Sequence, residues 1–460
     1  MTSDAVHSPS ISQYINHDFL KRLLFIATPI ILQSILFSSK GLIDILMLSQ
    51  LSEVDIAAMG IAAKALFVIT ILLTGIATGG GILSAQYWGA NNHLGVKKST
   101  VLSLFSTAVF AFIFALIFYF SPHAVMQLAT SSQEVIQRGS DYLSIVGFSL
   151  VFSAVVVSYT ASLRSIAEPK ISTFFSACGI LANIFLNWVL IFGHLGFPAL
   201  GIKGAALATL LSSVFEVVLL LAYLHIKKHL LTFNLADFTV ITSSSELKRF
   251  FSLSLPTTFN FLLWSVGIFS YHAIMGLSGV EGLAALSVMT PIESLSLSFL
   301  VGIANASAVI VGNELGAKQY QRAYYQAIIL VSIAIVVTCI TSLILFVNRE
   351  YILSLFPALS PTTESLSNTF VIILAVGIIL RSLPTTMVVG VLRAGGDVKF
   401  CLYQDVLTQW GFGIPLAFIA AYFLKLPPQW IYLFFFAETL FKWFACIYRF
   451  KSKKWLNPLA

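Results

Sequence analysis

Asp44 is a carboxylic acid placed inside a long apolar segment, which is a costly position for a charge. Insertion scales put that cost at about 2.5–3.5 kcal/mol, so a carboxylate in such a segment usually faces a cavity and has a function. Burial favours the protonated form of a carboxyl group, and a nearby cation favours the ionised form. A group poised between the two forms can bind and release a proton, and Asp44 is our first candidate for that chemistry.

Four further polar residues lie in apolar segments of the first half of the chain. Asn183 and Asn187 are four residues apart and share one helix face, while Tyr142 and Thr209 lie in the neighbouring segments. All five fall near the same end of their segments, so we expect one cluster that binds an ion or a substrate. The oxygens of Asp44, Asn183 and Asn187 could hold Na⁺ in place of a proton. Alternatively, the asparagines only join helices and Tyr142 is an interfacial anchor.

Two lysines offer a structural explanation for Asp44. Lys40 precedes it by four residues on the same helix face, and Lys64 lies at a similar depth in the next segment. Either could hold Asp44 ionised in a static ion pair, or the pairs could exchange during function. Pro29, in the same segment, removes a helix hydrogen bond and permits a kink. Other ionisable residues in apolar segments either line a cavity or pair with one another: Glu216, Glu293, Arg381 and Glu438.

Membrane helices must position these residues. The chain has 460 residues, of which 58% are hydrophobic and only 10% are charged, whereas soluble domains carry about 25% charged residues. About 20 apolar residues cross the bilayer core as a helix. The sequence predicts an all-α integral membrane protein with twelve such spans: 23–50, 56–82, 99–121, 139–163, 171–194, 200–225, 250–276, 282–312, 323–347, 366–392, 400–424 and 429–449.

The basic residues of the loops predict the orientation of the spans. Eighteen lysines and arginines fall in one alternating set of loops and four in the other. Because loops rich in Lys and Arg stay in the cytoplasm, we expect both termini on the cytoplasmic side of a bacterial inner membrane. The net charge of +7 is then a topology signal, and no nucleic-acid partner is expected. The sequence shows no Walker motif, metal cluster or catalytic triad, so we expect no enzyme and no cofactor beyond H⁺ or Na⁺ as coupling ion.

An internal repeat divides the chain into two halves. Residues 22–90 align without a gap with residues 249–317, and a second block aligns Leu163-Arg164 with Leu392-Arg393. The shift corresponds to six spans, an even number, so the halves have the same orientation in the membrane. Secondary transporters often have this plan, with the substrate site between the repeats. The predicted organisation is a cytoplasmic tail (1–18), a six-helix half (19–228), a cytoplasmic linker (229–246), a second six-helix half (247–450) and a cytoplasmic tail (451–460).

The two halves differ at the candidate cluster. Under the alignment, Asp44 corresponds to Tyr271, and the positions of the two asparagines are occupied by Phe412 and Leu416. The sequence therefore predicts that the polar pattern is confined to the first half. We expect the coupling site there.

Several motifs of the chain resemble the multidrug and toxic compound extrusion (MATE) family. They follow one another through both halves and comprise Pro29 with Asp44, Gln86 to Ala90, Leu163-Arg164 with Lys170, Asn183 to Gly193, Gly204-Ala205-Ala206 with Thr209, and Val311 to Ala317. The resemblance covers residues from about 20 to 450. It implies a twelve-helix, V-shaped exporter that moves organic cations and other amphipathic drugs outward, driven by H⁺ or Na⁺.

Within that family the chain looks most like the DinF-type branch. Members of this branch place an aspartate in span one, a tyrosine in span four and polar residues in span five, which Asp44, Tyr142, Asn183 and Asn187 match. Many members have an aspartate at the position of Asn187, so a mechanism with two carboxylates is not carried over. Another branch has a carboxylate in span seven where this chain has Trp264. The resemblance therefore does not imply a second-half ion site.

The expected function is export by a monomer that alternates between two access states. Asp44 would take up a proton from outside while a small organic drug enters from the cytoplasm or the membrane lipid, with H⁺ favoured over Na⁺ as coupling ion. One alternative is a flippase for lipid-linked precursors, for which Lys40, Lys64 and Arg381 could supply a cationic cavity. The other is a membrane scaffold or channel without transport activity.

Overall fold

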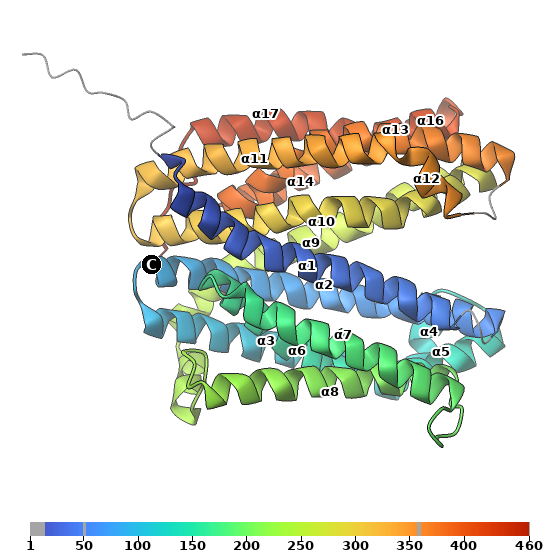
Figure 1. Cartoon of the computed structure of the whole chain (residues 1–460), viewed down its shortest axis with the longest axis horizontal. Helices are drawn as coiled ribbons and strands as arrows, with labels where there is room; N and C mark the ends of the chain where they lie inside the picture. Colours follow the sequence, from blue (N-terminus) through green and yellow to red (C-terminus); the bar gives the residue numbers. More distant parts are fainter. Residues whose placement is uncertain (1–13, 49–51, 357–359, 460) are drawn as a thin grey trace, which may run out of the picture.

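The computed structural model describes residues 14–48, 52–356 and 360–459. These residues form helices in two groups, which lie mostly in the lower and upper parts of Figure 1, and the first helix begins beside the upper group. The first group contains α1 (His17–Leu48), α2 (Glu53–Gly89), α3 (His93–Phe120), α4 (Pro122–Gln127), α5 (Gln133–Val146), α6 (Ser149–Ser165), α7 (Pro169–Phe192) and α8 (Ile202–Ile226). The 3-10 helix η2 (Leu235–Thr242) lies in the connection to the second group.

The second group repeats this order with more irregular helices. It contains α9 (Ser244–Gly276), α10 (Val280–Gly316), α11 (Tyr320–Val347), α12 (Arg349–Ser354), α13 (Pro361–Thr385), η3 (Thr386–Leu392), α14 (Val398–Asp405), η4 (Val406–Gly413), α15 (Ile414–Phe418), η5 (Ile419–Phe423), α16 (Pro428–Phe434) and α17 (Ala437–Lys451). The segments η3, η4 and η5 are π-helical turns. Pro384 and Pro415 stand beside them, and each removes a helix hydrogen bond.

Short-range signals set the helix ends beside the candidate residues. α2 begins after Ser52, whose Oγ accepts a hydrogen bond from the Asp55 amide at 3.1 Å. α7 begins at Pro169. Proline fits the first turn of a helix because a backbone N–H there has no acceptor within the helix, so its absence costs no hydrogen bond. α7 ends at Gly193, which has φ +77° in the left-handed region that favours glycine.

Eleven helical segments among the described residues are long and apolar enough to cross a membrane, and the pair α5 and α6 makes a twelfth. This confirms the predicted number of spans. We predicted one continuous helix over 139–163, but α5 and α6 meet at an angle of 51°. Gly147 stands at the bend, where a side chain would come within 2.9 Å of the Phe118 Cβ. Glycine is a common site of sharp kinks, and it permits the close contact here.

The helix bounds reproduce the internal repeat. When α2, α3 and α4 are shifted by 227 residues, they coincide with α10, α11 and α12. Contacts between the halves follow the same relation. Arg22 of α1 binds Glu314 of α10 at 3.2 Å, and the equivalent residues Arg249 of α9 and Tyr87 of α2 bind at 2.7 Å. A pseudo-twofold axis therefore passes between α1, α2, α9 and α10, which pack against one another across the interface.

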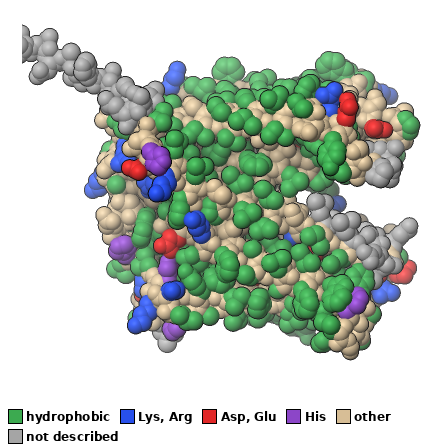
Figure 2. Space-filling view, in the orientation of Figure 1, with side chains coloured by type: hydrophobic (Ala, Val, Ile, Leu, Met, Phe, Trp, Pro, Cys, Tyr) green, Lys and Arg blue, Asp and Glu red, His purple; other side chains and the backbone are tan. Residues whose placement is uncertain are grey.

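The two halves meet most closely at the end of the bundle where α1 begins and the chain ends, which we call the terminal end (Figure 1). Gly89 there faces the backbone of Asn313, and Gly316 faces that of Gln86, so that a Cβ on either glycine would overlap the opposite backbone. Gln86 Nε2 also donates to the Asn457 carbonyl at 3.2 Å. At the opposite end, the far end, Figure 2 shows a notch between the halves. The bundle is therefore closed at the terminal end and open at the far end.

Candidate functional site

Asp44 lies on α1 near the far end, one turn before the helix ends at Leu48. Asn187 of α7, only 2% exposed, donates a hydrogen bond from Nδ2 to Asp44 Oδ1 at 2.8 Å. Asp44 itself is half-buried. Because the amide is neutral, this contact orients the carboxyl group without fixing its charge.

The other three predicted residues lie beside this pair. Asn183 Oδ1 accepts from Asn187 Nδ2 at 3.5 Å, and Asn183 Nδ2 donates to Thr209 Oγ1 of α8 at 3.4 Å. The Tyr142 hydroxyl, on α5, hydrogen-bonds Thr209 and lies within electrostatic range of Asp44. We call these five residues the outer cluster. The structure thus brings together all five predicted site residues, from four helices of the first half.

One hydrogen-bond acceptor of the outer cluster has no donor among the described residues. Asn187 Oδ1 is buried and accepts no hydrogen bond from the part of the chain that the structure describes. Buried polar atoms are seldom left without a partner. This oxygen is therefore available to a protonated carboxyl group, to a substrate N–H or to a hard cation such as Na⁺.

The two lysines do not form the ion pair that we considered for Asp44. Lys40 lies one turn away on α1 and within electrostatic range, but no ion pair within 4.0 Å joins it to Asp44 among the described residues. Lys64 of α2 is exposed, and its Nζ lies 5.9 Å from the centre of the Phe269 ring of α9. A static ion pair therefore does not explain Asp44 in this structure.

Pro29 lies inside α1, which continues as a helix from His17 to Leu48. The Thr173 hydroxyl, on α7, donates to the Pro29 carbonyl at 3.0 Å. This bond attaches α1 to α7 on the terminal side of the outer cluster. The kink remains a prediction.

Two of the other ionisable residues in apolar helices form a pair. Glu293 of α10 and Arg381 of α13 are joined by an ion pair, as the pairing alternative predicted. The Arg381 guanidinium also lies 4.8 Å from the centre of the Phe436 ring. Glu216 pairs with no basic residue within 4.0 Å in the described chain, and it accepts a hydrogen bond from the Ser176 hydroxyl at 2.7 Å.

A second buried polar network lies in the second half. Lys442 Nζ of α17 contacts Asp405 Oδ1 at 3.0 Å and Glu438 Oε1 at 3.1 Å. The Tyr271 hydroxyl donates to Glu438 Oε2 at 2.7 Å, and Asn260 Nδ2 donates to Asp405 Oδ2 at 2.7 Å. We call these five residues the second-half network. The prediction that the polar pattern is confined to the first half is therefore wrong.

The alignment missed this network for a simple reason. It compared only the counterparts of the outer cluster, whereas Asp405 and Lys442 correspond to Ser176 and Ser213 of the first half. Two signals in the sequence could have revealed it. Asp405 is an acid in an apolar span, and Glu438 precedes Lys442 by four residues, the spacing of an ion pair on one helix face.

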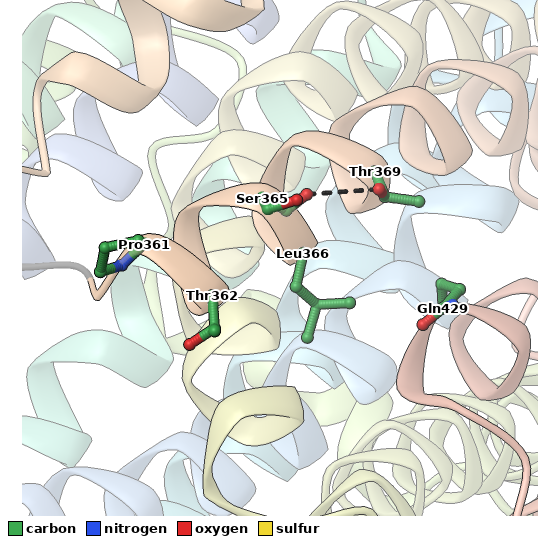
Figure 3. Close-up of a pocket in the computed structure, with 6 residues that line it drawn as sticks. All are labelled: Pro361, Thr362, Ser365, Leu366, Thr369 and Gln429. Carbon is green, nitrogen blue, oxygen red and sulfur yellow. Dashed lines mark hydrogen bonds between the residues drawn. The ribbon is translucent and has the colours of Figure 1, made fainter.

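A shallow pocket of about 450 Å³ lies at the far end of the second half. Figure 3 shows that α13 supplies most of its lining and that Gln429 of α16 faces it. The residues that line the pocket are Pro361, Thr362, Ser365, Leu366, Thr369 and Gln429. None of them is a candidate residue or has an ionisable side chain. The pocket therefore does not contain the outer cluster.

Twelve spans in two pseudo-symmetric halves, with a notch between them, form an architecture that many membrane transporters have. A family model described as MatE matches residues 29–189 and 256–419. The Uncharacterized transporter YisQ of Bacillus subtilis (strain 168) is 25% identical over 439 residues, which cover 95% of each chain. The Probable multidrug resistance protein NorM of Thermotoga maritima is 24% identical over 437 residues, covering 95% of this chain and 93% of the relative.

Solved structures agree on the fold. A multidrug resistance MATE family transporter of the MOP superfamily, solved in an outward-facing conformation, matches with a TM-score of 0.87 at 18% identity, covering 97% of this chain and 99% of that one. The chain belongs to the MatE family, whose members are transporters and not enzymes. The finer assignment to a DinF-type branch stays a prediction.

Proposed function

We propose that the chain is a secondary multidrug exporter that exchanges H⁺ for amphipathic or cationic organic compounds, acting as a monomer with no cofactor beyond its coupling ion. The outer cluster carries this proposal. It holds one carboxyl group, oriented by a neutral amide and joined to no ion pair among the described residues, at the open end of a two-half bundle. The multidrug resistance names of relatives such as the Thermotoga maritima protein support the substrate class.

Charge supplies the coupling. Ionised Asp44 attracts a cationic substrate, and protonated Asp44 does not, so the proton and the substrate exclude each other. In the state open at the far end, proton binding to Asp44 releases the substrate. Closure there and opening at the terminal end let the proton leave and a new substrate bind.

The loop charges support an orientation with the terminal end in the cytoplasm of a bacterium. Two of the eighteen basic residues are not loop charges in the structure, because their side chains bind inside the helix bundle: Arg164 binds Asn305 of α10, and Arg393 binds Asn260 of α9. Sixteen remain against four. The open far end then faces outward across the inner membrane.

The coupling ion is tested by gradients imposed separately on proteoliposomes. We expect ethidium, an aromatic cation, to be exported under a pH gradient alone, because the outer cluster has a single carboxyl group that can exchange a proton. A sodium gradient alone is expected to drive no export. Export driven by sodium alone would replace H⁺ by Na⁺, held by the oxygens of Asp44, Asn183 and Asn187.

Alternating access requires the close contact at the terminal end to open. Gly316→Val is expected to push α10 away from the Gln86 backbone and to favour the state open at that end. Spin labels on Asn91 and Lys318, in the equivalent loops after α2 and α10, report the separation. Gly276→Val is the matched control because a Cβ at Gly276 meets nothing within 4 Å. A distance distribution equal to that of the wild type would contradict this account of the closure.

The flippase alternative receives less support from the same geometry. It needs a cationic cavity, but Arg381 is neutralised by Glu293, and Lys64 lies over the Phe269 ring. A scaffold without transport is not favoured either, since the family consists of transporters.

A further inference from the structure

A second polar group lies deeper in the first half than the outer cluster. The Ser176 hydroxyl of α7 donates to Glu216 Oε1 of α8 at 2.7 Å, and Gln33 Nε2 of α1 donates to Ser176 Oγ at 3.2 Å. We call these three residues the deep layer. Glu216 is seven residues from Thr209, and Ser176 is seven from Asn183. At 1.5 Å per residue, the deep layer lies about 10 Å further into the membrane than the Asn183–Thr209 contact.

The deep layer is a closely fitted site. Ser176 is 0% exposed and Gln33 is 3% exposed, so the hydrogen bond between them is buried, while Glu216 itself is half-buried. Gly179 of α7 lets the carboxylate lie directly against that helix, because a Cβ there would stand 2.6 Å from Glu216 Oε2. Three helices therefore meet at one acid near the middle of the membrane.

The other half shows what distinguishes Glu216. In the internal repeat, Gln33 corresponds to Asn260 and Ser176 to Asp405. Asp405 forms an ion pair with Lys442 at 3.0 Å, which neutralises its charge. Glu216 has no basic group within 4.0 Å in the described residues. A charged carboxylate at the bilayer centre costs about 2.5–3.5 kcal/mol, which favours an acid that holds a proton and gives it up only in response to another charge.

Lys40 is placed to supply that other charge. It lies on α1 between Gln33 of the deep layer and Asp44, seven residues from the first and four from the second. These spacings put all three on one helix face. Lys40 is within electrostatic range of both Asp44 and Glu216. One lysine can neutralise only one of the two carboxylates at a time.

The remaining ionisable groups on α8 and on the helices packed against it have other surroundings. Tyr142 belongs to the outer cluster, Glu134 and His225 are exposed, and Cys178 is a free thiol on α7. The others have partners of their own: Arg138 with Asp55, Asp141 with Lys203, Arg164 with Asn305, Lys170 with the Phe25 ring, Tyr159 with the Phe233 ring and Tyr223 with the Phe175 ring.

We propose that Glu216 is a second proton-binding carboxylate whose ionised form pairs with Lys40, so that each cycle carries one proton on each acid. The inference rests on the proposed function and adds a stoichiometry to it. When a cationic substrate binds, both carboxyl groups release their protons to solvent. Lys40 then pairs with Glu216 while the substrate cation occupies the field of Asp44.

Proton counting tests this directly. Purified protein in weakly buffered detergent is titrated with ethidium, and a pH-indicator dye measures the protons released per ethidium bound. The wild type is expected to release twofold more protons than Glu216→Gln, which keeps only the proton of Asp44. Asp44→Asn, which lacks the group that attracts ethidium, is expected to release none. The double variant is expected to release none.

The outcomes separate the two proposals. If Glu216→Gln matches the wild type while Asp44→Asn loses its release, the role of Glu216 is overturned and the proposed function stands. If the wild type releases no protons, both are overturned. Glu216→Asp, which retains a carboxyl group, is expected to restore the count, and failure to do so counts against proton binding. The matched control Asp405→Asn is expected to leave the count unchanged; an equal loss there would assign the effect to general damage and overturn the inference.

Discussion

Asp44→Asn is expected to reduce ethidium export to the level of vesicles without protein. Asparagine has almost the same shape as aspartate, and its side-chain oxygen can still accept the hydrogen bond from Asn187 Nδ2, which is 2.8 Å long in the structure. The outer cluster should therefore keep its geometry. What is lost is the one group that both takes up a proton and attracts a cation. Export is measured in proteoliposomes under a pH gradient, at equal amounts of inserted protein.

The control for this prediction lies close by. Asp141 precedes Tyr142 on α5 and pairs with Lys203 at 3.2 Å, outside the outer cluster. Asp141→Asn is expected to retain wild-type export, because exposed ion pairs contribute little. Wild-type export by Asp44→Asn would remove Asp44 from the coupling mechanism.

Lys442→Met is expected to have the largest effect on stability. The substitution leaves Asp405 and Glu438 buried without their shared cation. Removing one partner from a buried ion pair lowers the free energy of unfolding by about 3–5 kcal/mol. The measurement is thermal unfolding in detergent, followed by tryptophan fluorescence.

Two further variants identify the cause of that loss. Lys64→Met removes an exposed lysine that forms no ion pair in the described chain, and it is expected to leave the unfolding temperature unchanged. Adding Asp405→Asn and Glu438→Gln to Lys442→Met is expected to recover most of the stability, since no uncompensated charge remains. Unchanged stability of Lys442→Met alone would show that the second-half network does not depend on its lysine.

The fold could be predicted from the sequence because its two strongest signals each extend over many residues. Apolar runs of membrane length predicted the spans, and the gapless alignment of residues 22–90 with 249–317 predicted the pseudo-twofold relation that Arg22–Glu314 and Arg249–Tyr87 display. The bend between α5 and α6 could not be predicted in the same way. It depends on a glycine meeting Phe118 of another helix, which hydropathy does not reveal.

The site could be predicted where a polar or acidic residue lies in an otherwise apolar span. Asp44 and the asparagines of α7 met that condition, and helical spacing placed them at one depth. Partner choice was not predictable in the same way. Lys40 was a possible partner for Asp44 by helical spacing and Lys64 by its depth. The structure places Lys64 over an aromatic ring and Lys40 within electrostatic range of two acids. Rotation of a helix about its axis decides such contacts, and the sequence of one helix does not fix it.

The most direct test of the account is the proton movement that substrate triggers. Inverted vesicles are acidified inside, ethidium is added outside, and a pH-sensitive dye follows the internal proton concentration in sodium-free buffer. Ethidium is expected to dissipate the gradient in vesicles with the wild type and to leave it intact with Asp44→Asn. A gradient that wild-type vesicles keep in the presence of ethidium, or lose equally with Asp44→Asn, would contradict proton coupling at the outer cluster.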